Sequence, residues 1–442
     1  MGRIQRNLST SQWIILGFAS VIVLGSILLM LPLATRDGEG ACFTDAIFTA
    51  TSAVCVTGLI VQDTATYWSG LGQVVILTLI QIGGMGVVTL AVAMAMASGR
   101  KISLKQRSTM QEAISAHHVG GIVRLTGFIV RMTILLELTG ALLMAPVFCG
   151  EFGLGRGVWY ALFHSVSAFC NAGFDLMGTK TPYSSLTYFV NHPVINVVIL
   201  SLIVIGGIGF LTWEDIKIHR WRFRRFRMQS KVILTTTALL IVIPTLYFFF
   251  FEFTKGTWST RFWSSLFQAV TPRTAGFNTA DLTQISEAGL AIMILLMLVG
   301  GSPGSTAGGM KTTTAAVLAF TALAVFRRRE HTQFFGRRVG EDTIRNAATI
   351  LVMYLTLFLA GGLLISRIES LPLLTCLYET ASAVGTVGLT LGITPKLGLV
   401  SRGILIILMY LGRVGGLTLI FATVSGHQNN TSRLPQEKMT VG

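Results

Sequence analysis

Four glycines in this chain each follow a short, mainly apolar segment, and each is followed by a bulky apolar residue. The four pairs are Gly58-Leu59, Gly173-Phe174, Gly276-Phe277 and Gly388-Leu389. Glycine adopts backbone angles that other residues avoid, so it suits a turn whose carbonyl groups face a common axis. Carbonyl oxygens around such an axis can replace the water of a cation. The repeated turn therefore predicts ion permeation.

We expect the four turns to form one selectivity filter, with a single good cation site near the glycines and no other metal. The filter residues are Val56, Thr57, Gly58, Leu59, Asn171, Ala172, Gly173, Phe174, Thr274, Ala275, Gly276, Phe277, Thr386, Val387, Gly388 and Leu389. Only the fourth turn comes near the Thr-Val-Gly core of a potassium-channel filter, so we expect imperfect exclusion of sodium. A single glycine of this kind is more simply a helix C-cap in a transmembrane hairpin. Four copies in register favour the filter.

Short helices must position these turns. They are predicted over residues 43–53, 158–168, 258–269 and 373–383, and each is too short to cross a bilayer. Irregular backbone survives at membrane depth only where it is buried in protein or lines water. Each helix points its C-terminus, which carries a partial negative charge, toward the turn. This arrangement favours a cation in a polar cavity.

The composition is that of a membrane protein. Hydrophobic residues make up 52% of the chain and charged residues 12%, and the mean hydropathy is +0.68. A water-soluble core cannot bury so many apolar residues. Eight spans are predicted, at residues 13–33, 74–97, 122–148, 194–213, 232–251, 291–326 with an interruption, 347–365 and 403–424. The predicted fold is an all-α membrane protein with four span, pore-helix, span repeats in pseudo-fourfold symmetry around a central pore.

The formal net charge is +15, and the positions of the basic residues follow a membrane topology. Lys and Arg accumulate in every second loop between spans, at residues 100–107, 217–231 and 327–338. This positive-inside pattern places both termini and the three basic loops in the cytoplasm of a multi-pass protein of the cell membrane. Because topology accounts for the charge, we expect no binding of nucleic acid. The basic loops also suit anionic lipid or a docked cytosolic partner.

The second span of the third copy contains an unusual run of helix breakers and hydroxyl groups. The run is Gly300, Gly301, Ser302, Pro303, Gly304, Ser305, Thr306, Ala307, Gly308 and Gly309. Proline and glycine should divide this span into two half-helices joined by a loop at membrane depth, which is a natural gate. Lys311 and Arg413 are intramembrane cations and candidate gate partners. We expect Arg413 to donate hydrogen bonds to carbonyls of the loop. In the first two copies, we expect the glycines of the second span to serve close helix packing.

The sequence motifs give little support for an enzyme. Residues 300–304 match the G-x-S-x-G pattern of a hydrolase elbow, but the required strand and histidine partner are missing from the pattern. The five cysteines lack metal-ligand spacing, and no nucleotide-binding fingerprint is present. We therefore expect neither an enzyme nor a bound cofactor.

The four turns, the broken third copy and the Gly-Arg of the fourth resemble the Ktr/Trk/HKT superfamily of cation transporters, and the eight spans are most similar to its KtrB-like branch. The resemblance covers essentially the whole chain. It implies repeats at residues 1–98, 99–220, 221–326 with the gate loop at 300–309, and 327–426, followed by a cytoplasmic tail at 427–442. In plant relatives a serine at the first filter position accompanies sodium preference. Here that position is Gly58, which implies potassium.

The same resemblance implies a homodimer of potassium-uptake subunits in the lipid bilayer. It also implies a cytosolic RCK-type (KtrA-like) ring that binds the nucleotide and controls the intramembrane loop, with Arg413 restraining that loop. The alternative is a sodium- or proton-coupled cation symporter of similar fold.

Overall fold

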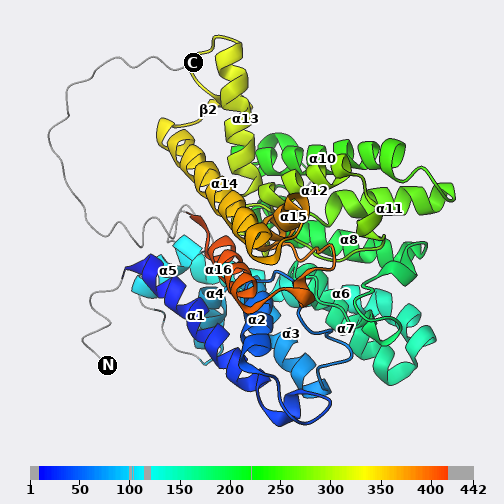
Figure 1. Cartoon of the computed structure of the whole chain (residues 1–442). Coiled ribbons are helices and arrows are strands. Elements are labelled where there is room, and N and C mark those ends of the chain that lie inside the picture. Colours follow the sequence, from blue (N-terminus) through cyan, green and yellow to red (C-terminus); the bar gives the residue numbers. More distant parts are fainter. Residues whose placement is uncertain (1–8, 99–101, 103, 114–120, 221, 417–442) are drawn as a thin grey trace.

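The computed structural model describes residues 9–98, 102, 104–113, 121–220 and 222–416, and these are mostly helical (Figure 1). The long helices are α1 (Thr10–Leu29), α6 (Ile122–Phe152), α10 (Met228–Tyr247) and α14 (Glu341–Glu369). The short helices that precede the glycine turns are α2 (Phe43–Val54), α7 (Leu154–Phe169), α11 (Trp258–Val270) and α15 (Leu373–Val384). The helices that follow the turns are α3 (Gly70–Met85), α4 (Val87–Ala97), α8 (Pro193–Gly207), α9 (Phe210–His219), α12 (Glu287–Val299), α13 (Thr312–Phe326) and α16 (Leu399–Val414).

Two further elements lie in the basic connections. Helix α5 (Leu104–Ala113) follows α4, and an antiparallel pair of strands, β1 (Gln333–Phe334) and β2 (Arg337–Arg338), joins α13 to α14. Residues 417–424 of the predicted last span and the predicted tail at 427–442 lie outside the described residues.

Four helices are long and apolar enough to cross a membrane, at Ser11–Leu29, Ile122–Phe152, Met228–Glu252 and Glu341–Glu369. Only 28% of the most apolar window of α6 is buried within the protein. Its exposed side chains include Leu138 and Leu142, of which Leu142 is 74% exposed. An apolar surface of this size needs a lipid environment. The long helices therefore form the lipid-facing layer.

Hydroxyl side chains fix where several helices begin. Ser9 and Gln12 form a capping box at the start of α1, in which each side chain bonds the backbone of the other. Ser69 accepts a hydrogen bond from the amide of Gly72 at the start of α3, and Ser286 accepts one from Gly289 at the start of α12. These caps satisfy backbone donors that have no partner within the helix.

The second spans of the first two copies are not single helices, and this corrects the expectation that their glycines serve only for packing. The axes of α3 and α4 bend by 95° at Gly86, and those of α8 and α9 bend by 96° at Gly209. Both glycines have positive φ, 84° and 92°. The bend therefore requires a backbone angle that glycine adopts readily. Close packing holds at Gly83, where an added methyl would meet the backbone of Val54 at 2.1 Å.

Polar side chains are buried along all four short helices. Helix α15 packs against α12, α14 and α16. In Figure 1 the first helix (α1, blue) and the last (α16, red) lie side by side, and the two are in contact. The first and last helices of the described chain are therefore neighbours.

Candidate ion pathway

The four glycine turns meet around a common centre. A methyl group built on Gly58 would lie 2.4 Å from the carbonyl oxygen of Ala172, and one on Gly173 would lie 2.8 Å from that of Ala275. A methyl group on Gly276 would lie 2.5 Å from the carbonyl oxygen of Val387, and one on Gly388 would lie 2.1 Å from that of Thr57. Each turn thus touches the next, and the fourth touches the first. In this ring, copies one and three lie opposite each other, as do copies two and four.

The turns share an unusual backbone. Each glycine has positive φ, between 70° and 93°. The residue two positions earlier also has positive φ, and these residues are Val56, Asn171, Thr274 and Thr386. Left-handed angles are rare for residues with a side chain, above all for β-branched ones. Such strain persists only where the surroundings enforce it, and it is concentrated at functional sites.

Hydroxyl groups near the ends of the short helices hold the turns. Ser52 and Ser382 accept hydrogen bonds from the amides of Gly58 and Gly388 at 3.1 and 3.0 Å. In the other two copies the hydroxyl donates instead, from Ser167 to the carbonyl of Phe174 and from Thr271 to that of Phe277. All four contacts are buried. The turn backbone is therefore held by hydroxyl groups of the short helix that precedes it.

Arg273 precedes the third turn but points away from the ring. Its Nη2 lies 3.3 Å from the hydroxyl of Thr237 on α10, which is a long helix of the outer layer. The Arg273 guanidinium therefore connects the third turn to a neighbouring long helix.

The break between α12 and α13 leaves Gly300 to Lys311 without helix, as the sequence predicts for this span. The final residue of the break, Lys311, has φ 86° and ψ 137°. Nearly the same angles occur at Gly86 and Gly209, where the bent helix pairs of the first two copies meet, and at Gly415, which follows the end of α16. Lysine therefore occupies a conformation for which the other copies use glycine.

The loop from Gly300 to Gly309 is bound to copy two. The amides of Ser302 and Thr306 donate to the carbonyls of Gly207 and Gly206, at 3.0 and 3.3 Å, and the Thr306 hydroxyl donates to Phe169 at 3.1 Å. The loop also reaches copy four, because a methyl on Gly308 would lie 2.0 Å from the Thr386 hydroxyl. The loop thus runs between opposite quarters of the ring, on the side where the second spans break.

Two cations hold the loop. The Lys311 ammonium donates to the carbonyl of Ala307 at 2.7 Å. The Arg413 guanidinium donates to Thr306 through Nη1 and to Gly83 through Nη2. The hydrogen bond to Thr306 is the loop contact that the sequence predicts for Arg413. The bond to Gly83 was not predicted, and through it one side chain of copy four joins copies three and one.

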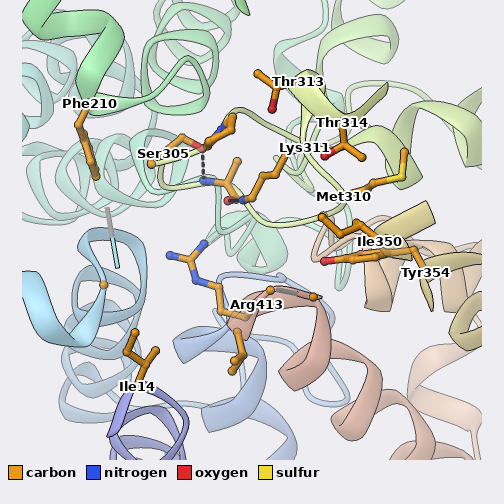
Figure 2. A pocket seen from close by; sticks show the side chains of 18 of the residues that line it. Ile14, Phe210, Ser305, Met310, Lys311, Thr313, Thr314, Ile350, Tyr354 and Arg413 are labelled. Atoms are coloured by element: carbon orange, nitrogen blue, oxygen red, sulfur yellow. Dashed lines mark hydrogen bonds between the residues drawn. The ribbon is translucent and has the colours of Figure 1, made fainter. Parts of the chain in front are cut away.

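A cavity of about 380 Å³ adjoins the loop and is lined by residues of α1, α4, α13, α14 and α16. Figure 2 places Lys311 and Arg413 close together at this cavity, with Ser305 of the loop and Tyr354 of α14 nearby. None of the lining residues, all within the described part of the chain, is Asp or Glu. Two positive charges without a lining carboxylate oppose a cation in this space.

Sequence reasoning missed three groups near the ring. Glu137 is a buried carboxylate within α6 whose Oε2 accepts from Gln81 at 3.2 Å. His164 and Glu379 are fully buried on the short helices α7 and α15. A charged or titratable residue inside an apolar segment is the signal that could have found them. Throughout the described residues, no group of three or more His, Cys, Asp or Glu side chains could hold a metal ion.

The sequence model of the TrkH family, described as a cation transport protein, matches residues 4–433. The chain is 38% identical to the potassium/sodium uptake protein NtpJ of Enterococcus hirae, covering 100% of this chain and 99% of that protein. It is also 38% identical to the Ktr system potassium uptake protein B of Bacillus subtilis, covering 98% and 96% of the two chains.

Its fold is similar to the crystal structure of the potassium transporter TrkH from Vibrio parahaemolyticus, with a TM-score of 0.76, 18% identity, and coverage of 96% of this chain and 87% of that one. The family model matches almost the full length of the chain, and the two relatives are also covered over almost their full length. The chain therefore belongs to the TrkH family of cation transport proteins within the Ktr/Trk/HKT superfamily, and it is a transporter and not an enzyme.

Proposed function

We propose that this chain is the pore subunit of a potassium-uptake system and passes K+ down its electrochemical gradient. The observation that carries the proposal is the closed ring, in which each turn approaches the carbonyl of the next. The names of the relatives, potassium uptake protein and potassium/sodium uptake protein, support K+ as the permeant ion.

The ring selects through backbone oxygens. Positive φ recurs at alternate residues, at Val56 and Gly58 and again at Thr386 and Gly388, and we propose that this backbone directs the carbonyl groups toward the axis. Carbonyls so held can replace the hydration shell of K+. Helices α2, α7 and α15 end four residues before their glycines and α11 ends six before, so four partial negative charges point at the ring. Since the four turns differ in sequence, discrimination against Na+ is incomplete.

The loop at 300–309 is the gate. In the observed conformation it bridges copies two and four below the ring, and Lys311 and Arg413 place positive charge beside it. Entry of K+ into the cavity then requires the loop to move and the side chains of Lys311 and Arg413 to exchange their hydrogen-bond partners. The short contacts that hold the loop are hydrogen bonds, each individually weak enough to exchange.

The resemblance and the relatives named for a Ktr system support the assembly that we propose. The chain forms four repeats, at 1–98, 99–220, 221–326 and 327–426, in the plasma membrane with both termini cytoplasmic. Two copies form a homodimer. The basic connections around α9, α10 and the β1–β2 pair face the cytoplasm and bind a KtrA-like ring of RCK subunits, which carries the nucleotide.

Expression in a bacterial strain that lacks its own potassium-uptake systems tests this function. Growth at low external K+ should be restored by the wild-type chain, together with its RCK partner if the chain alone is silent. Restored tolerance of sodium without any gain in K+ content would contradict the proposal.

A sodium- or proton-coupled symporter remains the second candidate because of Glu137. This carboxylate is 5% exposed within α6 and, among the described residues, forms no salt bridge. Buried carboxylates within spans often belong to proton pathways. Coupling would make K+ uptake depend on the gradient of the second ion.

A further inference from the structure

Copies two and four form the same type of hydrogen bond behind the filter, although the side chains that accept it differ. His164 lies nine residues before Gly173, and Glu379 lies nine before Gly388 (173 − 164 and 388 − 379). Each accepts a hydrogen bond from the amide three residues after its glycine, Leu176 at 3.3 Å and Leu391 at 3.1 Å. The same pore-helix position thus holds the same backbone position in two opposite quarters of the ring.

The geometry fixes the tautomer of His164. Its Nδ1 lies 2.7 Å from the carbonyl oxygen of Tyr160, so this nitrogen must carry the proton. Its Nε2 faces the amide N–H of Leu176, so this nitrogen must be the acceptor. Imidazolium, which has two donors, cannot make the second contact. The histidine is therefore neutral where it holds the filter.

Aromatic rings enclose this histidine. The ring of Phe148 on α6 lies 5.2 Å from that of His164, and the ring of Phe277 lies 6.2 Å away. Phe277 directly follows the glycine of copy three. His164 therefore contacts two neighbouring turns, one through a hydrogen bond and the other through ring packing.

Glu379 makes a denser set of contacts. Oε1 accepts from the Thr390 hydroxyl and the Leu391 amide, and Oε2 accepts from the Thr394 hydroxyl at 2.8 Å. All these donors belong to the segment that leads away from the fourth turn. The carboxylate thus ties that segment to the pore helix at three points.

Copies one and three lack this hydrogen bond. His164 and Glu379 each lie three residues before the hydroxyl that holds their turn, Ser167 and Ser382, and the residues three before Ser52 and Thr271 are Thr49 and Gln268. The side-chain polar atoms of Thr49 and Gln268 are buried and form no hydrogen bond among the described residues.

We propose that His164 and Glu379 are positioning residues that set ion selectivity by holding two opposite quarters of the ring at a fixed distance from the axis. Neither touches the ion. This proposal rests on the proposed function as a potassium pore. The two quarters without the contact depend on these two for alignment, because each turn packs directly on its neighbours.

A pair of substitutions separates positioning from mere packing. In His164→Gln the terminal amide reaches the place of Nε2 and can accept from Leu176, whereas in His164→Asn it reaches only the place of Nδ1, toward Tyr160. Both variants are polar and neutral. The ratio of K+ to Na+ flux in proteoliposomes should stay near the wild-type value in His164→Gln and fall roughly tenfold in His164→Asn, as expected for one lost buried hydrogen bond. Equal ratios in the two variants would overturn the proposal.

Two substitutions of Glu379 provide an independent test if the His164 variants do not fold. Glu379→Gln keeps an acceptor for Leu391, and Glu379→Leu removes it, so only the second should lose discrimination. Hydrogen exchange of the segments around Leu176 and Leu391 gives a readout that needs no transport. Faster exchange in His164→Asn and Glu379→Leu alone supports positioning, and unchanged exchange contradicts it. A wild-type protein that carries no K+ would instead refute the proposed function, while the exchange result would still decide the role of the two residues.

Discussion

The guanidinium of Arg413 is hydrogen-bonded to the carbonyl of Thr306, a residue 107 positions away in the chain. Its other terminal nitrogen donates to Gly83. The first contact holds the loop of copy three, and the second holds the bend between α3 and α4 in copy one. One side chain therefore restrains the breaks in two different spans at once.

Removing this restraint should increase ion flux. In Arg413→Ala the loop loses a charge-assisted hydrogen bond of about 1.5–3 kcal/mol, so its open population should rise roughly tenfold or more. Arg413→Lys keeps the charge but cannot reach both carbonyls, and we expect it to lie between Ala and wild type. Potassium efflux from proteoliposomes measures the effect. Reduced flux in a folded Arg413→Ala protein would argue against a restraining role.

Deleting the loop should act in the same direction. A chain without residues 302–308 lacks the segment that bridges copies two and four, so it should conduct K+ more freely and with little regulation. The same efflux assay reports the change, with size-exclusion profiles as the control for folding. Complete loss of flux from a monodisperse protein would mean that the segment does not gate.

The backbone at Lys311 should be strained, because the other three copies place glycine at these angles. Lys311→Gly and Lys311→Ala both remove the ammonium and differ only in a methyl group. We expect the glycine variant to be more stable by about 1 kcal/mol, since glycine adopts positive φ without steric cost. Thermal unfolding in detergent compares the two. Equal or greater stability of the alanine variant would refute the strain.

Selectivity should be sensitive to the first glycine of the ring. In Gly58→Ser the added Cβ would approach the carbonyl of Ala172 to 2.4 Å and occupy positive φ, so two turns must shift. We expect the ratio of K+ to Na+ flux to fall by roughly tenfold. Gly155→Ser is the matched control, because no atom lies within 4 Å of a Cβ built there. An unchanged ratio in Gly58→Ser would count against the filter assignment.

Glu137 distinguishes a passive pore from a proton-coupled carrier. Glu137→Gln keeps an oxygen for the amide of Gln81 but cannot release a proton. In a passive pore, the K+ flux driven by a membrane potential should change by no more than roughly twofold and stay independent of a pH gradient. Flux that follows the pH gradient in wild type and loses this dependence in Glu137→Gln would favour the symporter.

The sequence was most informative where a pattern recurs. The repeated glycines predicted the positions of all four turns. Helices α2, α11 and α15 begin at the residues predicted, because a short apolar segment that ends at a glycine turn can form few structures other than a short helix. Glycine and proline in the third copy likewise predicted the break between α12 and α13. Arg413 was predicted to bind the loop because an unpaired cation in a span is costly.

What the sequence could not indicate depends on contacts between copies. The bends at Gly86 and Gly209 looked like packing glycines, since a single glycine within an apolar span has the same appearance whether the helix continues or turns. The equivalence of His164 and Glu379 was hidden because imidazole and carboxylate share only their ability to accept a hydrogen bond. The shared angles of Lys311 and three glycines appear only in the backbone.

The most direct test of the central claim is the flux of K+ into proteoliposomes under an imposed membrane potential, measured with and without competing Na+ and with no gradient of either Na+ or protons. A ring of carbonyls that selects K+ predicts uptake driven by the potential alone, reduced only weakly by an equal concentration of Na+. Flux that requires a Na+ or proton gradient, or that carries Na+ as readily as K+, would contradict the account.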